Sequence, residues 1–226
     1  MEKNQYELCL KILRRLKQAR VLEKITLVGS WTMLFYEKYF ISTKYIANIR
    51  TRDIDFALQR RTVFAKKVNI PALIKDLGFI TEFVGKEGYM RFIHPDLIIE
   101  FLVPEIGKGT DMPYTVSQLG INAQPLRYLS FLLDNTINVK FEELTIKLPH
   151  PAAYVLHKFI IFKRRLKKDK QDKDIGEALA IFKALVDNKN ESKLKNIFTS
   201  MPLKWQKTII KNLESINEIE LAKFLM

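Results

Sequence analysis

The change of pattern at Pro149-His150-Pro151 constrains the fold of this chain most. Before it, short apolar runs bounded by Gly or Pro alternate with helical spacing, which indicates strands between helices. After it, apolar residues recur at helical spacing as far as the C-terminus, residue 226. We therefore predict an α/β (α+β) fold, with a mixed domain over residues 1–148 and an all-helical domain over residues 149–226.

Individual elements follow from the same patterns. Strands are predicted over residues 25–28, 53–58, 79–84, 89–94, 97–103, 121–124 and 144–148. Helices of the first domain are predicted over residues 6–20, 31–40, 71–77 and 126–133. Those of the second are predicted over residues 152–168, 172–186, 191–198, 203–213 and 216–225.

Several classes of protein are excluded by composition. The only cysteine is Cys9, so no intrachain disulfide forms and no cysteine-based zinc site is expected. The N-terminus lacks the apolar region of a signal peptide, and no apolar stretch reaches the ~20 residues of a membrane span. We expect a cytoplasmic protein without a membrane partner.

The chain carries a net charge of +13, and residues 151–226 hold a disproportionate share of it. Residues 158–173 contain eight Lys or Arg against two Asp, and one helix face is predicted to carry Lys163, Lys167 and Lys170. Such a stretch favours binding to RNA phosphates. A solvated helix face explains the same residues equally well, and the sequence leaves both interpretations open.

Three features of the first domain favour a phosphate-handling site. Gly29-Ser30 ends a short apolar run, where a strand-to-helix turn offers backbone N–H groups to phosphate. Asp53 and Asp55 alternate with apolar residues, so both project from one face of a strand, where paired carboxylates suit Mg²⁺ or Mn²⁺. Glu100 stands alone within an aliphatic run and needs a cation, a metal or solvent opposite it.

Together, Gly-Ser, Asp-x-Asp and a later carboxylate resemble the nucleotidyltransferase-fold (DNA polymerase beta-like) superfamily. Segments 27–30, 50–56, 124–133 and 149–159 also resemble a bacterial family of stand-alone nucleotidyltransferase-fold proteins. The resemblance implies a twisted mixed sheet with flanking helices and metal-dependent transfer of a nucleoside monophosphate from a nucleoside triphosphate (NTP). It also implies that Gly29 and Ser30 hold the triphosphate and that Asp53, Asp55 and Glu100 bind the metals and form the catalytic set.

A more distant resemblance is to the abortive-infection nucleotidyltransferase toxins, which have a Lys-containing helix followed by an Asp in the next helix. Lys158 and Asp174 are the nearest matches, although Asp169 and Asp172 compete with Asp174. This resemblance implies that Lys158 and Asp174 contact the nucleotide, to which we add Arg50 beside the Asp-x-Asp strand.

The resemblance is not complete, because the interval from Ser30 to Asp53 is long and the third carboxylate is Glu rather than the commoner Asp. Residues 41–49 are therefore expected to form an insertion near the site.

Our interpretation is a nucleotidyltransferase whose NTP binds in a cleft between the two domains. RNA, including a tRNA end, is the favoured acceptor, and a protein hydroxyl or a small molecule follows. The alternative is a catalytically inactive module of the same fold that binds nucleotide or nucleic acid. A toxin-like role and the oligomeric state are left open by the sequence.

Overall fold

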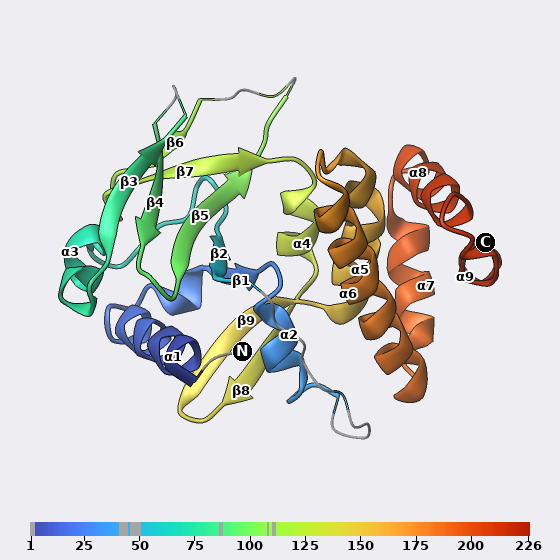
Figure 1. The fold of residues 1–226 in the computed structure, drawn as a ribbon, viewed down its shortest axis with the longest axis horizontal. Coiled ribbons are helices and arrows are strands. Elements are labelled where there is room, and N and C mark those ends of the chain that lie inside the picture. Colours follow the sequence, from blue (N-terminus) through green and yellow to red (C-terminus); the bar gives the residue numbers. More distant parts are fainter. Residues whose placement is uncertain (1–2, 41–44, 46–50, 86–87, 108, 110–111) are drawn as a thin grey trace. The chain divides into compact units, whose positions relative to one another are not determined.

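The computed structural model describes residues 3–40, 45, 51–85, 88–107, 109 and 112–226 (Figure 1). Its internal contacts divide the chain into two compact units. Unit 1 comprises Met1–Tyr39 and Ile46–Pro149, and unit 2 comprises Phe40–Tyr45 and His150–Met226. Among the described residues, none of the helices is both long and apolar enough to cross a membrane.

A mixed sheet forms the centre of unit 1 (Figure 1). Its main strands run in the order β1 (Thr26–Val28), β2 (Asp53–Ala57), β5 (Ile98–Pro104), β4 (Tyr89–Ile93) and β3 (Ile80–Val84). β5 also pairs in parallel with β7 (Ile121–Leu126), which pairs with the short β6 (Tyr114–Val116). β2 and β5 are parallel, whereas β1, β3 and β4 pair antiparallel to their neighbours.

The sheet is buried on one face, and the pattern of β2 shows why. Ile54 and Phe56 are fully buried, whereas the alternate residues Asp53 and Asp55 are exposed and half-buried. Phe56 packs against Phe101 of β5, with ring centroids 5.6 Å apart. Since successive side chains of a strand point to opposite faces, burying the apolar pair fixes the acidic pair on the other face.

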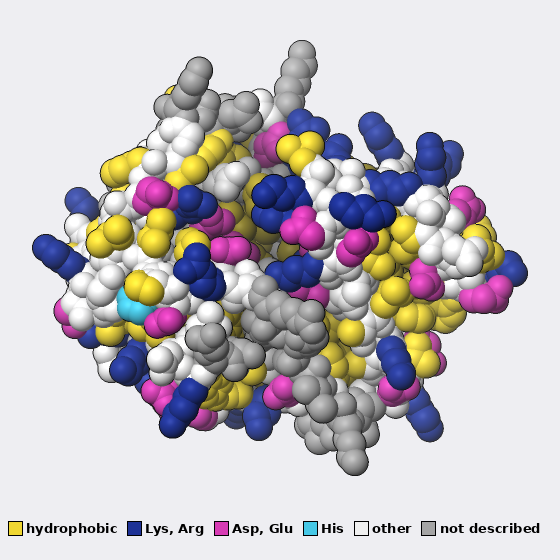
Figure 2. All heavy atoms as spheres, viewed as in Figure 1, with side chains coloured by type: hydrophobic (Ala, Val, Ile, Leu, Met, Phe, Trp, Pro, Cys, Tyr) yellow, Lys and Arg dark blue, Asp and Glu magenta, His cyan; other side chains and the backbone are white. Residues whose placement is uncertain are grey.

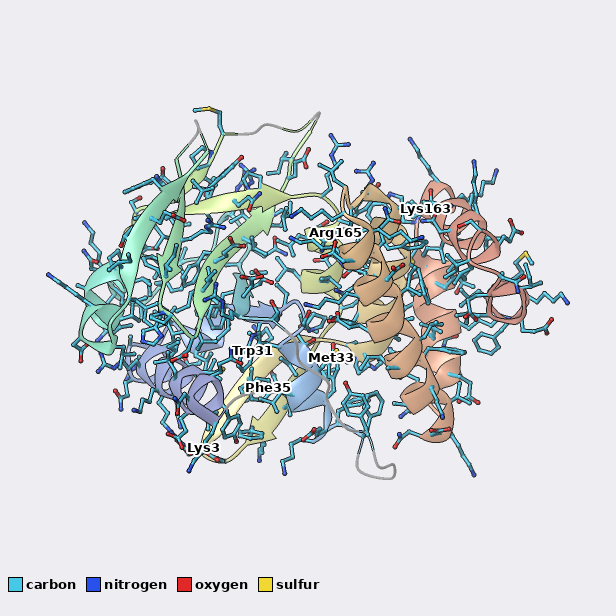
Figure 3. All side chains as sticks on the ribbon, viewed as in Figure 1. Lys3, Trp31, Met33, Phe35, Lys163 and Arg165 are labelled. Atoms are coloured by element: carbon cyan, nitrogen blue, oxygen red, sulfur yellow. The ribbon has the colours of Figure 1, made fainter. Side chains whose placement is uncertain are left out.

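Helices complete unit 1, together with a hairpin of β8 (Thr136–Phe141) and β9 (Leu144–Pro149). α1 (Lys3–Gln18) buries one apolar stripe that includes Cys9, and α4 (Leu129–Asp134) is a short helix before the hairpin. α2 (Thr32–Tyr36) follows the Gly-Ser turn and carries Phe35, which Figure 3 labels. The ring of Phe35 meets that of Phe141 in β8 edge to face, with centroids 5.2 Å apart. Further along the chain, α3 (Ile70–Ile74) continues as a 3₁₀ turn that ends at Gly78, whose φ is +89°.

The described part of unit 2 is helical (Figure 1). Its helices are α5 (Pro151–Ile161), α6 (Lys168–Asp187), α7 (Glu191–Ser200), α8 (Leu203–Glu214) and α9 (Ile219–Leu225). The buried Asn212 of α8 donates a hydrogen bond of 2.7 Å from Nδ2 to the Phe159 carbonyl of α5. His150 caps α5, because its Nδ1 accepts a 3.1 Å hydrogen bond from the Ala152 amide.

The predicted fold class is confirmed, but several elements differ from the predictions. Neither β6 nor β8 was predicted, although β9, the partner of β8, was. A helix over residues 152–168 is wrong, because α5 ends at Ile161 and only a 3₁₀ turn follows, over Phe162–Arg164. Lys163, Lys167 and Lys170 therefore do not share one helix face. In an unbroken helix Lys163 and Lys167 would stand one turn apart, where like charges are destabilising.

Candidate active site

A row of charged side chains crosses four strands of the sheet in unit 1. Asp55 of β2 is in register with Glu100 of β5, Glu100 with Arg91 of β4, and Arg91 with Glu82 of β3. Residues in register on neighbouring strands lie ~4.8 Å apart and share a face. The row therefore reads acid, acid, base, acid, with adjacent carboxylates at its β2 end.

Arg91 binds the acidic residues on both sides of it. Its guanidinium lies 2.7 Å from Glu82 Oε2 and 3.6 Å from Glu100 Oε1. The hydrogen bond with Glu82 and the nearby charges of Glu100 and Asp53 raise the pKa of Arg91 despite partial burial, so the group stays charged. Arg91 is thus the cation of this row, and its field also reaches Asp53.

Asp53 lies on the same face of β2 as Asp55, two residues before it. It is exposed, and its Oδ2 accepts a 3.1 Å hydrogen bond from the Thr51 hydroxyl. The Thr51 oxygen in turn accepts from the Asp53 amide, also at 3.1 Å. These two hydrogen bonds orient the Asp53 carboxylate at the start of β2.

The Gly29-Ser30 turn meets Asp55 directly. Val28 of β1 is in register with Asp55, so the turn begins where that carboxylate stands. Gly29 has a φ of +72°, and a Cβ at this position would collide with Asp55 Oδ2. Only glycine satisfies both the left-handed backbone and the close approach. Ser30 is buried, and the Gly29 carbonyl accepts a 2.8 Å hydrogen bond from Thr32 Oγ1.

The donor set of this face suits a divalent cation. Asp53, Asp55 and Glu100 offer only carboxylate oxygens, the ligands that Mg²⁺ and Mn²⁺ prefer. Within the described part of the chain, no three His, Cys, Asp or Glu side chains converge as a complete metal site. Arg91, which pairs with Glu100 from β4, forms the ion pair with its carboxylate.

A second charged cluster lies inside unit 2, between α5 and α6. Lys158 Nζ is 2.5 Å from Asp174 Oδ1 and 2.9 Å from Glu177 Oε2, and at most 7% of any of these three side chains is exposed. Tyr154 donates a 2.7 Å hydrogen bond to Glu177. Arg165 reaches Asp174 from the surface at 2.8 Å, with 43% of its side chain exposed.

Burial and charge act in opposite directions on this cluster. Burial alone would raise the pKa of the Asp174 carboxyl, but Lys158 and Arg165 together hold it below its usual value. Burial lowers the pKa of His157 to about 3, with Lys158 acting in the same direction. The cluster therefore consists of ionised Asp174 and neighbouring cations beside a neutral imidazole.

The predicted site residues fall into two groups, one in each unit. In unit 1 the structure brings Asp55, Glu100 and Gly29 together, with Asp53 on the same face. In unit 2 it joins Lys158 to Asp174, but as a buried ion pair, so contact of Lys158 Nζ with a triphosphate would require the pair to open. Arg50 and most of the expected insertion over residues 41–49 lie outside the described residues.

Sequence reasoning missed Glu82 and Arg91 in unit 1 and Tyr154, Arg165 and Glu177 in unit 2. Arg91 and Glu82 stand on either side of a Gly-containing turn, which suggests a hairpin but not its register. Glu177 lies three residues after Asp174 and therefore shares its helix face, so the spacing alone could have pointed to Glu177.

Comparison with known proteins now identifies the family. A family model described as nucleotidyltransferase matches residues 7–202. The chain belongs to this nucleotidyltransferase family. As a member it is a transferase, and nucleotidyl transfer is its general reaction.

A solved structure with a nucleotidyltransferase-like title shares the fold. An antigenic nucleotidyltransferase-like protein from Paracoccidioides brasiliensis aligns with a TM-score of 0.52 at 14% identity, covering 96% of this chain and 91% of that one. ANT(2")-Ia in complex with adenylyl-2"-tobramycin aligns with a TM-score of 0.49 at 12% identity, covering 87% of this chain and 98% of that one. Among curated proteins, none matches the chain.

Proposed function

We propose that this nucleotidyltransferase uses Asp53, Asp55 and Glu100 to hold Mg²⁺ or Mn²⁺ and transfers a nucleoside monophosphate from an NTP to an acceptor. The acceptor oxygen forms a bond to the α-phosphorus while the bond to the β-phosphate oxygen breaks, and pyrophosphate leaves. The proton of the acceptor hydroxyl passes to Glu100. Such a metal, when bound, supplies Lewis-acid stabilisation of charge on the phosphoryl oxygens.

One observation carries this proposal, namely the register of Asp55 and Glu100 beside the Gly29 turn. Two adjacent carboxylates on neighbouring strands repel each other unless a cation compensates them. The row supplies only one cation among the described side chains, Arg91, and Glu82 shares it. Two carboxylates in register beside the Gly29 turn therefore support binding of a metal–NTP complex at this edge of the sheet.

The test is transfer of label from each α-³²P NTP, with Mg²⁺ or Mn²⁺, to total RNA, to protein and to small molecules of a cell extract. Asp53→Asn/Asp55→Asn removes both β2 carboxylates, and Asp187→Asn serves as a control at an exposed acidic position at the end of α6. We expect the double variant to lose at least ~10³-fold of the transfer rate, because metal and phosphate binding fail together. Equal labelling by wild type and double variant would refute the assignment.

RNA is the acceptor we favour, because the basic run between α5 and α6 is exposed. Residues 163–170 contain six Lys or Arg against one Asp, and all eight residues are exposed. Figure 2 shows Lys and Arg side chains gathered over this junction, and Figure 3 labels Lys163 and Arg165 there. Such a surface binds RNA phosphates with an affinity that falls steeply with salt.

This choice of acceptor is tested by binding to labelled tRNA over a series of salt concentrations. Lys167→Glu/Lys168→Glu is expected to weaken binding and to flatten the salt dependence, whereas Lys189→Glu/Lys193→Glu, elsewhere on unit 2, is the control. Label that enters protein or a small molecule instead would contradict RNA as acceptor while leaving nucleotidyl transfer intact. NTP binding without any transfer would favour the inactive module.

A further inference from the structure

The charged row contains a cation that the expected chemistry does not use. Arg91 lies on the same sheet face as the candidate metal ligands, one strand from Glu100 and two from Asp55. Its guanidinium approaches Glu100 Oε1 at 3.6 Å, and a third of its side chain is exposed. Within the described part of the chain, Arg91 Nε is buried without a hydrogen-bond partner.

Arg91 and a metal would compete for the same carboxylate. A cation beside Glu100 favours its ionised form and lowers the negative potential that a divalent ion meets at the β2 end of the row. Glu82 acts in the opposite sense, because its 2.7 Å contact holds Arg91 on the β3 side. Arg91 thus lowers the negative potential at the site, and Glu82 limits this effect by holding Arg91 on the β3 side.

We propose that Arg91 serves as a built-in counter-ion of the acidic site and, by its charge beside Glu100, sets the affinity of the site for the divalent ion. Glu82 is the anchor that keeps Arg91 from closing over Asp53 and Asp55. This inference rests on the proposed function, since it assigns a regulator to the same site.

The competition predicts opposite effects for two neighbouring substitutions. Arg91→Gln removes the competing charge, so Mn²⁺ should bind about two- to fivefold more tightly, an effect of the size expected for a partly exposed ion pair. Glu82→Gln leaves Arg91 to the remaining carboxylates, so Mn²⁺ should bind about two- to fivefold more weakly. Arg91→Lys keeps the charge and should bind Mn²⁺ like wild type.

The measurement is the Kd of Mn²⁺ by calorimetry and by the loss of its free paramagnetic resonance signal, on the full chain without nucleotide. Asp53→Asn identifies the fraction of binding that belongs to the acidic site. Arg14→Gln is the matched control, because Arg14 forms an ion pair with Glu142 at 2.7 Å and is similarly exposed. Circular dichroism and thermal unfolding establish that each variant is folded.

The outcomes separate the two proposals. Tighter binding by Arg91→Gln together with weaker binding by Glu82→Gln supports the counter-ion. Weaker or unchanged binding by folded Arg91→Gln, with wild-type binding still dependent on Asp53, overturns the counter-ion alone and makes Arg91 a structural support of Glu100. Wild-type binding that does not depend on Asp53 overturns the proposed function, and the counter-ion role with it.

Discussion

Acidic and basic residues meet in both units, but with opposite consequences. On the sheet of unit 1, Asp53 is exposed and Asp55 half-buried, and Arg91 is shared between two acids. In unit 2, Lys158, Asp174 and Glu177 are almost completely buried. Exposed carboxylates remain able to bind a ligand. Buried carboxylates stay bound to their buried lysine partner, because leaving a buried charge without a partner is costly. Burial therefore decides which cluster is a candidate site.

The largest effect on stability is expected at Lys158. Lys158→Met leaves Asp174 and Glu177 buried beside an apolar side chain, so we expect a loss of about 3–5 kcal/mol in the free energy of unfolding. Urea denaturation followed by circular dichroism measures it. Arg14→Met, at the exposed pair with Glu142, should lose less than about 1 kcal/mol. Similar losses of unfolding free energy in the two variants would contradict the distinction between the buried cluster of unit 2 and the exposed ion pairs of unit 1.

A pH dependence is expected from His150, at the start of unit 2. Burial lowers its pKa to about 4, and its Nδ1 must be unprotonated to accept the Ala152 hydrogen bond. Between pH 6.5 and 4 the unfolded chain binds a proton that the folded chain excludes, so stability falls as the pH falls, by up to about 3 kcal/mol.

Urea denaturation across this pH range measures the effect. His150→Asn keeps a good helix cap without a titrating group, so the loss of stability on acidification should be smaller than in wild type. His157 titrates in the same range in both proteins, and the difference between them therefore isolates His150. An identical pH profile for both proteins would show that His150 does not carry the effect.

A smaller loss of stability, with a large effect on the site, is expected at Gly29. Gly29→Ala forces a side chain into left-handed backbone at φ +72° and against Asp55, so we expect about 1–2 kcal/mol of destabilisation. Gly107 is a matched control, because its φ is +68° and no atom of the described residues lies within 4 Å of its Cβ position. Both variants bear the backbone strain, but only Gly29→Ala should weaken Mn²⁺ binding. Equal Mn²⁺ affinities would show that Asp55 does not need the close approach.

The sequence predicts those parts of the site that depend on local pattern. The alternation in residues 53–56 correctly places two acids opposite two buried apolar residues, and the lone acid in an aliphatic run points to Glu100. Arg91 and Glu82 were not found, because their roles depend on the register between three strands, which no local pattern fixes. The end of α5 was missed because Phe159, Phe162 and Leu166 keep helical spacing across it.

The smallest effect is expected at Arg165, which tests the comparison from within one cluster. Arg165 and Lys158 both bind Asp174, at 2.8 Å and 2.5 Å, but 43% of the Arg165 side chain is exposed against 7% of Lys158. Water replaces an exposed guanidinium at little cost, so Arg165→Gln should lose less than about 1 kcal/mol of unfolding free energy. Because Lys158 still holds the Asp174 pKa below its usual value, the acid limb of the stability profile should move only slightly upward in pH. A loss as large as that of Lys158→Met would mean that Asp174 depends on the surface cation, and that exposure does not separate structural from available charges in this protein.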